Sequence, residues 1–256
     1  MIEILSSHIW PSEDIFVIVS VVVIFLFAGI VKGFLGIGLP SAAMAFLTLV
    51  MDPTIAISLL TLPIIFTNLL QFARCEGPMH IAKKYWLFAI AIMLSIFITS
   101  FFILSYPKVL LTLAIGIAMV LFSLTQLFDL RLNIADGYEW HIGVGLFAGV
   151  LGGLSSIWSP PVAMYLLARN ISKSEFIGAT GFMFLAGSLP LAAGLSFAGI
   201  LTTTTILKSL VGLIAVVLGF RVGEALREFA PQGVFRIIVL WAFLIMGARL
   251  IAIGLF

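Results

Sequence analysis

One basic side chain, Lys32, lies in an otherwise uncharged and glycine-rich part of the sequence. The stretch reads Gly29-Ile-Val-Lys32-Gly33-Phe-Leu-Gly36-Ile-Gly38-Leu-Pro40. A lysine at the centre of an apolar membrane segment costs about 2.5 to 3.5 kcal/mol on insertion scales. A bound anion would neutralise it, so Lys32 is predicted to contact an anionic ligand. In the alternative reading, the ammonium group of Lys32 reaches the membrane surface and has no ligand.

A second stretch of the same kind occurs further along the chain. It reads Gly149-Val-Leu-Gly152-Gly153-Leu-Ser155-Ser156-Ile-Trp158-Ser159-Pro160-Pro161. In both stretches glycines precede proline, which suits the first turn of a helix, and Ser159 is expected to cap the second helix. The start of a helix carries free N–H groups and a partial positive charge. Each stretch is therefore predicted to provide half of an anion-binding site.

The predicted site draws on both stretches and on two polar residues of later helices. Helix–helix hydrogen bonding is the alternative role for Asn68 and Thr180, and packing is the alternative for Trp158. The residues predicted to bind the anion are Lys32, Gly33, Gly36, Gly38, Pro40, Ser41, Asn68, Gly152, Gly153, Ser155, Ser156, Trp158, Ser159, Pro160 and Thr180.

These residues must be positioned by membrane helices. Hydrophobic residues make up 62% of the chain and charged residues 9%, whereas about 25% of a soluble domain is charged. Most uncharged runs are long enough to cross a hydrocarbon core, which takes about 20 residues. We therefore predict an all-α integral membrane protein with a single transmembrane domain over residues 1–256. The predicted helices are 12–33, 39–51, 54–74, 83–105, 108–128, 139–153, 160–170, 174–198, 203–221 and 233–255.

Two of these segments are too short to cross the membrane. Residues 41–51 and 161–169 measure about 16 and 14 Å as helices, about half of the core. They occupy equivalent places in two halves of five segments each. We therefore predict two inverted-topology repeats, 1–130 and 131–256, whose short re-entrant helices meet near the midplane and hold the ligand there.

Lysine and arginine indicate the orientation, because cytoplasmic loops hold an excess of them. If both termini lie outside, only Lys108 falls in an outside loop. The residues of the inside loops are then Arg74, Lys83, Lys84, Arg131, Arg169, Lys173, Arg221, Arg227 and Arg236. The same orientation places the turn at Asp52 outside and the turn at Ser172 inside.

Several functions are disfavoured by what the sequence lacks. It has no nucleotide-binding loop, no paired histidines and no nucleophile elbow, so we expect neither an enzyme nor an ATP-driven pump. A single cysteine, Cys75, excludes an intramolecular disulfide. No metal, cofactor or nucleic-acid partner is expected; the partners are a small anion and the lipid bilayer, and a homo-oligomer is left open. A passive anion channel and a membrane scaffold or insertase are the alternatives to a transporter.

The two glycine-proline stretches and their spacing resemble the TauE/SafE family, also called the sulfite exporter family, over essentially the whole chain. The resemblance implies export of sulfite, sulfoacetate or related sulfonates across a prokaryotic inner membrane. The family's glycine-proline motif falls on Gly33, Gly36, Gly38 and Pro40, and again on Gly149, Gly152, Gly153 and Pro160. The glycine spacing of 116 between the two copies implies that Ser155 to Ser159 are inserted in the second.

Overall fold

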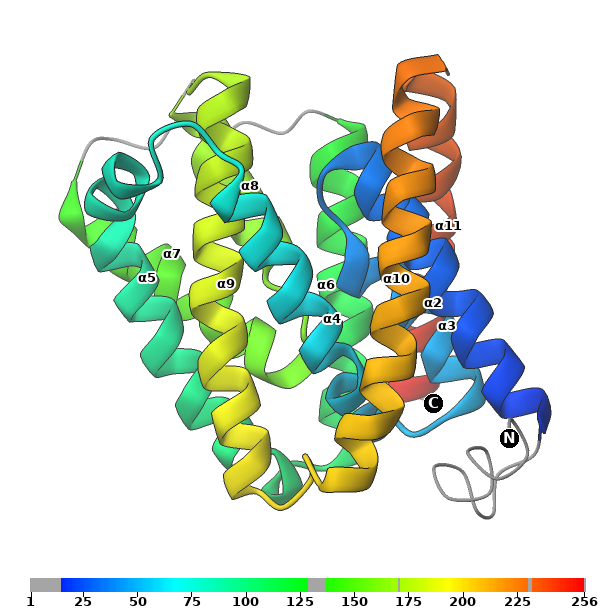
Figure 1. Ribbon diagram of the computed structural model, residues 1–256. Helices are drawn as coiled ribbons and strands as arrows, with labels where there is room; N and C mark the ends of the chain where they lie inside the picture. Colours follow the sequence, from blue (N-terminus) through cyan, green and yellow to red (C-terminus); the bar gives the residue numbers. More distant parts are fainter. Residues whose placement is uncertain (1–14, 129–136, 170, 230–231, 256) are drawn as a thin grey trace.

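The computed structural model describes residues 15–128, 137–169, 171–229 and 232–255, and this part of the chain is helical without strands (Figure 1). Ten α-helices follow one another, with a short 3-10 turn at Ile103–Ser105. They are α2 (Ile15–Leu35), α3 (Leu39–Val50), α4 (Pro53–Ala73), α5 (Pro78–Phe101), α6 (Lys108–Leu127), α7 (Tyr138–Ser155), α8 (Ser159–Ala168), α9 (Lys173–Phe197), α10 (Thr203–Phe229) and α11 (Gln232–Leu255).

All ten predicted segments are present as helices, and the all-α prediction is confirmed for the described residues. Three boundaries were wrong by more than a turn. Helix α5 ends at Phe101 instead of residue 105, because a separate 3-10 turn follows it. Helix α5 begins at Pro78 instead of residue 83, because the left-handed Gly77 and Pro78 start it before the basic residues. Helix α10 continues through the charged residues after 221 to Phe229.

Seven helices are long and apolar enough to cross a membrane, namely α2, α4, α5, α6, α9, α10 and α11. Helices α3 and α8 have only 12 and 10 residues, or about 18 and 15 Å. Neither can cross a ~30 Å hydrocarbon core, of which they span about 60% and 50%. The chain is therefore a multi-pass membrane protein with two short helices inside the bundle.

Close helix pairs surround these short helices. Helix α2 packs along α10, α5 along α7, and α6 along α11. The α2–α10 contact brings the two backbones together at glycines: a Cβ added to Gly29 or Gly33 would lie 2.3 or 2.2 Å from a carbonyl oxygen of α10. Small residues spaced four apart allow this approach in membrane helices. The ends of α2 and α7 are thereby held in fixed positions.

The two chain breaks have equivalent helix boundaries and begin with the same left-handed turn, but their backbones differ at Gly38, with φ of 95°, and Trp158, with φ of −108°. Helix α2 ends at Leu35 and α3 begins at Leu39, while α7 ends at Ser155 and α8 begins at Ser159, a shift of 120 residues at each boundary. Gly36 and Ser156 are left-handed, with φ of 81° and 60°. The Gly36 N–H donates to Lys32 O, and the Ser156 N–H to Gly152 O, both over 2.7 Å.

The predicted insertion of Ser155 to Ser159 is therefore wrong. The spacing is 120 residues from Gly29 and Gly149 through Pro40 and Pro160, without an extra segment. Matching glycine to glycine gave a false spacing of 116, because Ser156 occupies the position of Gly36. Backbone conformation is retained at this position where residue type is not.

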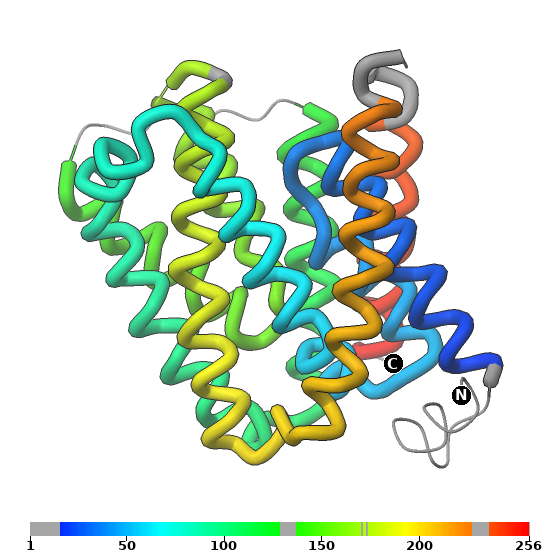
Figure 2. Tube along the Cα trace, viewed as in Figure 1, coloured from blue at the N-terminus to red at the C-terminus, as the bar shows by residue number. Residues whose placement is uncertain are grey.

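The turns that follow the short helices lie on opposite faces of the molecule. Figures 1 and 2 show the α3–α4 turn near the N-terminal start of α2 and near the C-terminal end of α11, whereas the α8–α9 turn lies at the far end. Asp52 caps α4 by accepting the Thr54 N–H, and Ser172 caps α9 by accepting the Glu175 N–H. The two capping residues are again 120 positions apart. Arg131 and the predicted repeat boundary lie outside the described residues.

Candidate functional site

The two breaks meet at one pocket in the interior of the bundle. Residues of both breaks line it, together with side chains of α4 and α9. The lining residues are Lys32, Ile37, Gly38, Leu39, Pro40, Ile64, Asn68, Ser156, Trp158, Ser159 and Phe184. The cavity volume is about 10 Å³, close to the space that one water molecule needs. The pocket in this conformation is therefore nearly closed.

Lys32 is buried beside this pocket, with only 3% of its surface exposed. Its Nζ donates to Thr67 Oγ1 over 3.0 Å and to Asn68 Oδ1 over a shorter distance, and both acceptors are neutral. No described carboxylate forms an ion pair with Lys32. The alternative reading, in which Lys32 extends to the membrane surface, is wrong for this structure. An ammonium group has three donors, so one remains for a ligand.

Helix α4 presents Thr67 and Asn68 because Pro63 interrupts its backbone hydrogen bonding. Proline lacks an N–H, so the carbonyl of Leu59, four residues earlier, loses its helical partner. Ser209 of α10 replaces that partner: its Oγ donates to Leu59 O over 2.7 Å. The Thr67 hydroxyl in turn donates to Pro63 O over 2.6 Å, which leaves its oxygen lone pair for Lys32.

The second break contributes neutral hydrogen-bonding groups. Ser156 Oγ, Trp158 Nε1 and Ser159 Oγ are buried and have no hydrogen-bond partner within the described part of the chain, and the same holds for Ser41 Oγ at the start of α3. Buried polar groups are normally paired, because leaving one unpaired costs about 1 to 3 kcal/mol. Three of these groups, Ser156, Trp158 and Ser159, line one pocket and indicate a site for a polar ligand.

The first turns of both short helices border the pocket through Leu39, Pro40 and Ser159. No side chain caps either helix: Gly38 has none to offer, and Trp158 precedes α8 without a capping hydrogen bond. The expectation that Ser159 caps α8 was wrong, because Ser159 is the first residue of the helix. Prolines remove N–H groups from the first turn of each helix, so it is chiefly the partial positive charge at both helix starts that favours an anion between them.

Apolar side chains form the remaining wall. Ile37 and Leu39 come from the first break, Ile64 from α4 and Phe184 from α9. The rings of Trp158 and Phe184 meet edge to face, with 6.0 Å between centroids. The pocket thus combines a single cation and neutral donors with an apolar side.

The predicted site residues divide into two groups. Seven of them, Lys32, Gly38, Pro40, Asn68, Ser156, Trp158 and Ser159, line the pocket together. The others lie outside the lining: Gly33 and Gly153 are helix-contact residues, Gly152 lies beneath the Trp158 ring, Ser41 and Pro160 are buried in the first turns of α3 and α8, and Gly36 forms the left-handed turn. Ser155 accepts the Ile157 N–H and donates to Leu151 O.

Thr180 does not line the pocket, and its hydrogen bonds are to other residues. Its hydroxyl donates to Phe176 O over 2.8 Å and accepts a hydrogen bond from Gln71 Nε2 over 3.1 Å. The structure therefore gives Thr180 a role in joining α4 to α9. Sequence reasoning missed Ile64 and Phe184, because an apolar residue in an apolar helix has no distinguishing signal. It also missed Thr67, whose hydroxyl accepts a hydrogen bond from Lys32.

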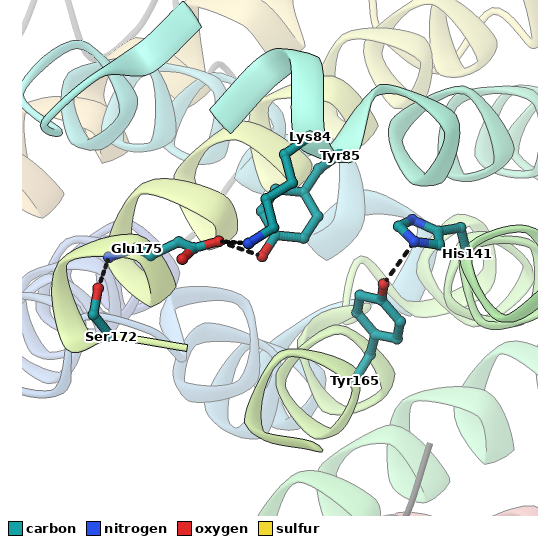
Figure 3. A network of polar contacts seen from close by, with 6 residues as sticks. All are labelled: Lys84, Tyr85, His141, Tyr165, Ser172 and Glu175. Carbon is teal, nitrogen blue, oxygen red and sulfur yellow. Dashed lines mark hydrogen bonds and ion pairs between the residues drawn. The ribbon is translucent and has the colours of Figure 1, made fainter. Parts of the chain in front are cut away.

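A separate polar cluster lies towards the ends of α5, α7, α8 and α9 (Figure 3). The Glu175 carboxylate accepts hydrogen bonds from Lys84 Nζ over 2.6 Å and from the Tyr85 hydroxyl over 2.8 Å. Nearby, the Tyr165 hydroxyl lies 3.1 Å from His141 Nε2. None of these residues lines the pocket. The cluster joins the ends of these helices and is not part of the pocket between the two breaks.

Comparison with known proteins identifies one match. The family described as "Sulfite exporter TauE/SafE" matches residues 21–250, most of the chain. No curated protein and no solved structure gives a significant match. No group of three or more histidine, cysteine or acidic residues within the described ranges could hold a metal ion.

Proposed function

This chain belongs to the TauE/SafE sulfite exporter family, and on that basis we propose that it is a secondary transporter that exports small sulfur-containing anions, such as sulfite or short sulfonates. Its place is the inner membrane of a prokaryotic cell, with both chain termini outside. The site is the pocket between the two breaks. Lys32 supplies the charge, and the hydroxyls, the Trp158 indole and the short-helix starts supply hydrogen-bond donors.

The observation that carries the proposal is the environment of Lys32. A buried ammonium group with only neutral partners is an uncompensated charge, which is unfavourable in a membrane protein. An anion in the adjoining pocket neutralises it and also satisfies Ser156, Trp158 and Ser159. A cationic or neutral substrate would leave the charge of Lys32 unpaired.

Helix packing supports the proposed inverted repeat. If α2 to α6 correspond to α7 to α11 in order, the α2–α10 contact matches α7–α5, and α10–α4 matches α5–α9. Likewise α2–α3 matches α7–α8, and α3–α11 matches α8–α6. The contacts α4–α9 and α6–α11 each join corresponding helices. Such reciprocal packing is expected when two similar units are related by a two-fold axis in the membrane plane.

The small volume of the pocket favours a carrier over an open channel. An ion with several heavy atoms needs more than the roughly 10 Å³ that the cavity offers. We propose that the short helices separate to admit the anion on one side and close behind it before release on the other. The inside-negative potential, worth about 2.3 kcal/mol per charge per 100 mV, favours export of an anion.

Flux from proteoliposomes tests the proposal. Vesicles loaded with sulfite or methanesulfonate should release the anion at a rate that saturates with internal concentration, and Lys32→Met should abolish release. Lys108→Met is the matched control, because Lys108 is exposed, pairs with Asp52 and does not line the pocket; it should retain the rate. A rate that rises linearly with concentration would establish a channel. Absence of flux for every sulfur anion would leave the scaffold alternative.

A further inference from the structure

We infer that the pocket accepts substrates with a single negative charge and rejects those with two, with Lys32 as the residue that sets this limit. The inference rests on the proposed function, since it concerns the same site. It narrows the substrate class to hydrogensulfite and short sulfonates with uncharged tails. Sulfate, thiosulfate and sulfoacetate, which carry two charges near neutral pH, fall outside it.

The described lining of the pocket carries a single charge. Among the described residues, Lys32 is the only charged one that borders the pocket. The other polar groups of the lining are neutral and can donate hydrogen bonds without adding charge. They belong to Asn68, Ser156, Trp158 and Ser159. One substrate charge therefore completes one buried ion pair with Lys32. A second substrate charge has no cation among the described residues of the site.

The helix starts do not replace a second cation. Each short helix presents a partial charge equivalent to roughly half an elementary charge, but its measured effect on a nearby anion is small. Loss of water from an ion is much more costly, and only a well-placed counter-ion offsets it. The N–H groups at Leu39 and Ser159 can thus orient the oxygens that Lys32 neutralises, and cannot support another buried charge.

The apolar wall opposes a second charge on the substrate tail as well. If the anionic head lies against Lys32 and Ser156, the rest of a small sulfonate must lie near Ile64, Trp158 and Phe184. Trp158 and Phe184 are 2% and 8% exposed, so this side is shielded from water. A methyl or amide group is tolerated there, whereas a carboxylate would lose its water without gaining a cation.

A matched pair of ligands tests the charge limit. Sulfoacetate and its amide, 2-amino-2-oxoethanesulfonate, have nearly the same size and shape and differ by one negative charge. Binding to the purified full-length protein is measured by isothermal titration calorimetry at neutral pH, with methanesulfonate as a smaller reference. We expect the amide and methanesulfonate to bind and sulfoacetate to bind at least about 100-fold more weakly. Sulfate should likewise fail to compete with methanesulfonate.

The outcomes separate this inference from the proposed function. Equal affinity for sulfoacetate and its amide, or effective competition by sulfate, overturns the charge limit while leaving an anion transporter. Failure of all these anions to bind overturns the proposed function itself. Lys32→Arg keeps the charge and should therefore preserve the preference for the amide over sulfoacetate. Equal binding of these two ligands by Lys32→Arg would contradict the role assigned to Lys32.

Discussion

The two breaks of this molecule share their helix boundaries and a left-handed turn, and differ in chemistry. Lys32 of the first corresponds to Gly152 of the second, and Gly38 corresponds to Trp158. A Cβ on Gly152 would lie 2.8 Å from the Trp158 ring, so a larger residue at 152 would displace that ring. One break therefore provides the cation and the other provides bulk and neutral donors. The comparison teaches that two breaks with equivalent boundaries can place different side chains at one pocket.

The largest expected effect concerns the glycines that hold the breaks. A Cβ at Gly33 would lie 2.2 Å from the backbone oxygen of Phe220, whereas at Gly153 it would meet Thr99 Cβ at 2.6 Å. Gly33→Ala should destabilise the protein by about 3 kcal/mol and Gly153→Ala by less, since overpacking costs about 1 to 3 kcal/mol. Thermal unfolding followed by circular dichroism measures this. Gly143→Ala, where nothing lies within 4 Å, is the neutral control.

If Gly153→Ala proved the more damaging substitution, the closer fit assigned to the first break would be wrong. If both alanine variants unfolded like Gly143→Ala, the tight α2–α10 contact would not contribute to stability.

The second effect distinguishes the cation of the first break from the rest of the site. Lys32→Met should weaken methanesulfonate binding at least about 100-fold, because it removes the only buried charge of the pocket. The same substitution should raise the unfolding temperature in the absence of ligand, because an uncompensated buried charge is removed. Calorimetric binding and thermal unfolding are compared on one preparation. A variant that is less stable yet binds normally would show that Lys32 has a structural role only.

A reciprocal exchange at the left-handed turns should have a smaller effect. Ser156 adopts φ of 60°, a conformation that costs a residue with a Cβ about 1 to 2 kcal/mol and costs glycine little. Ser156→Gly should therefore stabilise the protein by about 1 kcal/mol and weaken anion binding by about tenfold through loss of one donor. Gly36→Ser should destabilise the protein by a similar amount. Tighter binding by Ser156→Gly would contradict the donor role of this hydroxyl.

The smallest expected effect concerns the two capping residues, Asp52 and Ser172. Burial disfavours the Asp52 carboxylate, but hydrogen bonds from Lys108 and the Thr54 N–H, with the charge of Lys108, hold its pKa below the usual value. Its ionised form therefore adds stability at neutral pH, and this is lost as the pH falls through the folded-state pKa. Asp52→Asn keeps the cap, so it should cost less than about 1 kcal/mol at pH 7, and this cost should disappear once the pH lies below the lowered folded-state pKa.

Unfolding temperatures of Asp52→Asn and Ser172→Asn across this pH range measure the difference. The Ser172 variant should show no such pH dependence relative to the unchanged protein. A pH-dependent effect at Ser172 would contradict the assignment.

Most of the fold could be predicted from the sequence, because charges are rare and mark helix ends. Lys32 was conspicuous for the same reason, as a charge without a nearby opposite charge. The alignment of the breaks failed at Ser156, where residue type differs from Gly36 although both residues are left-handed. It also failed at Trp158, where both the residue type and φ differ from those of Gly38. The sequence predicts that Thr180 binds the anion, because it cannot show that Gln71 and Phe176 already form hydrogen bonds with the Thr180 hydroxyl.

Trp158 gives the pocket an optical reporter of its own. Its indole is 2% exposed at the site, whereas Trp86, Trp140 and Trp241 are 40% to 54% exposed on the outer surface. Indole emission depends on the polarity and charge around the ring. Replacing the other tryptophans with phenylalanine would leave a chain whose fluorescence spectrum responds to the arrival of an anion, and stopped-flow mixing could then follow the opening of the short helices in real time.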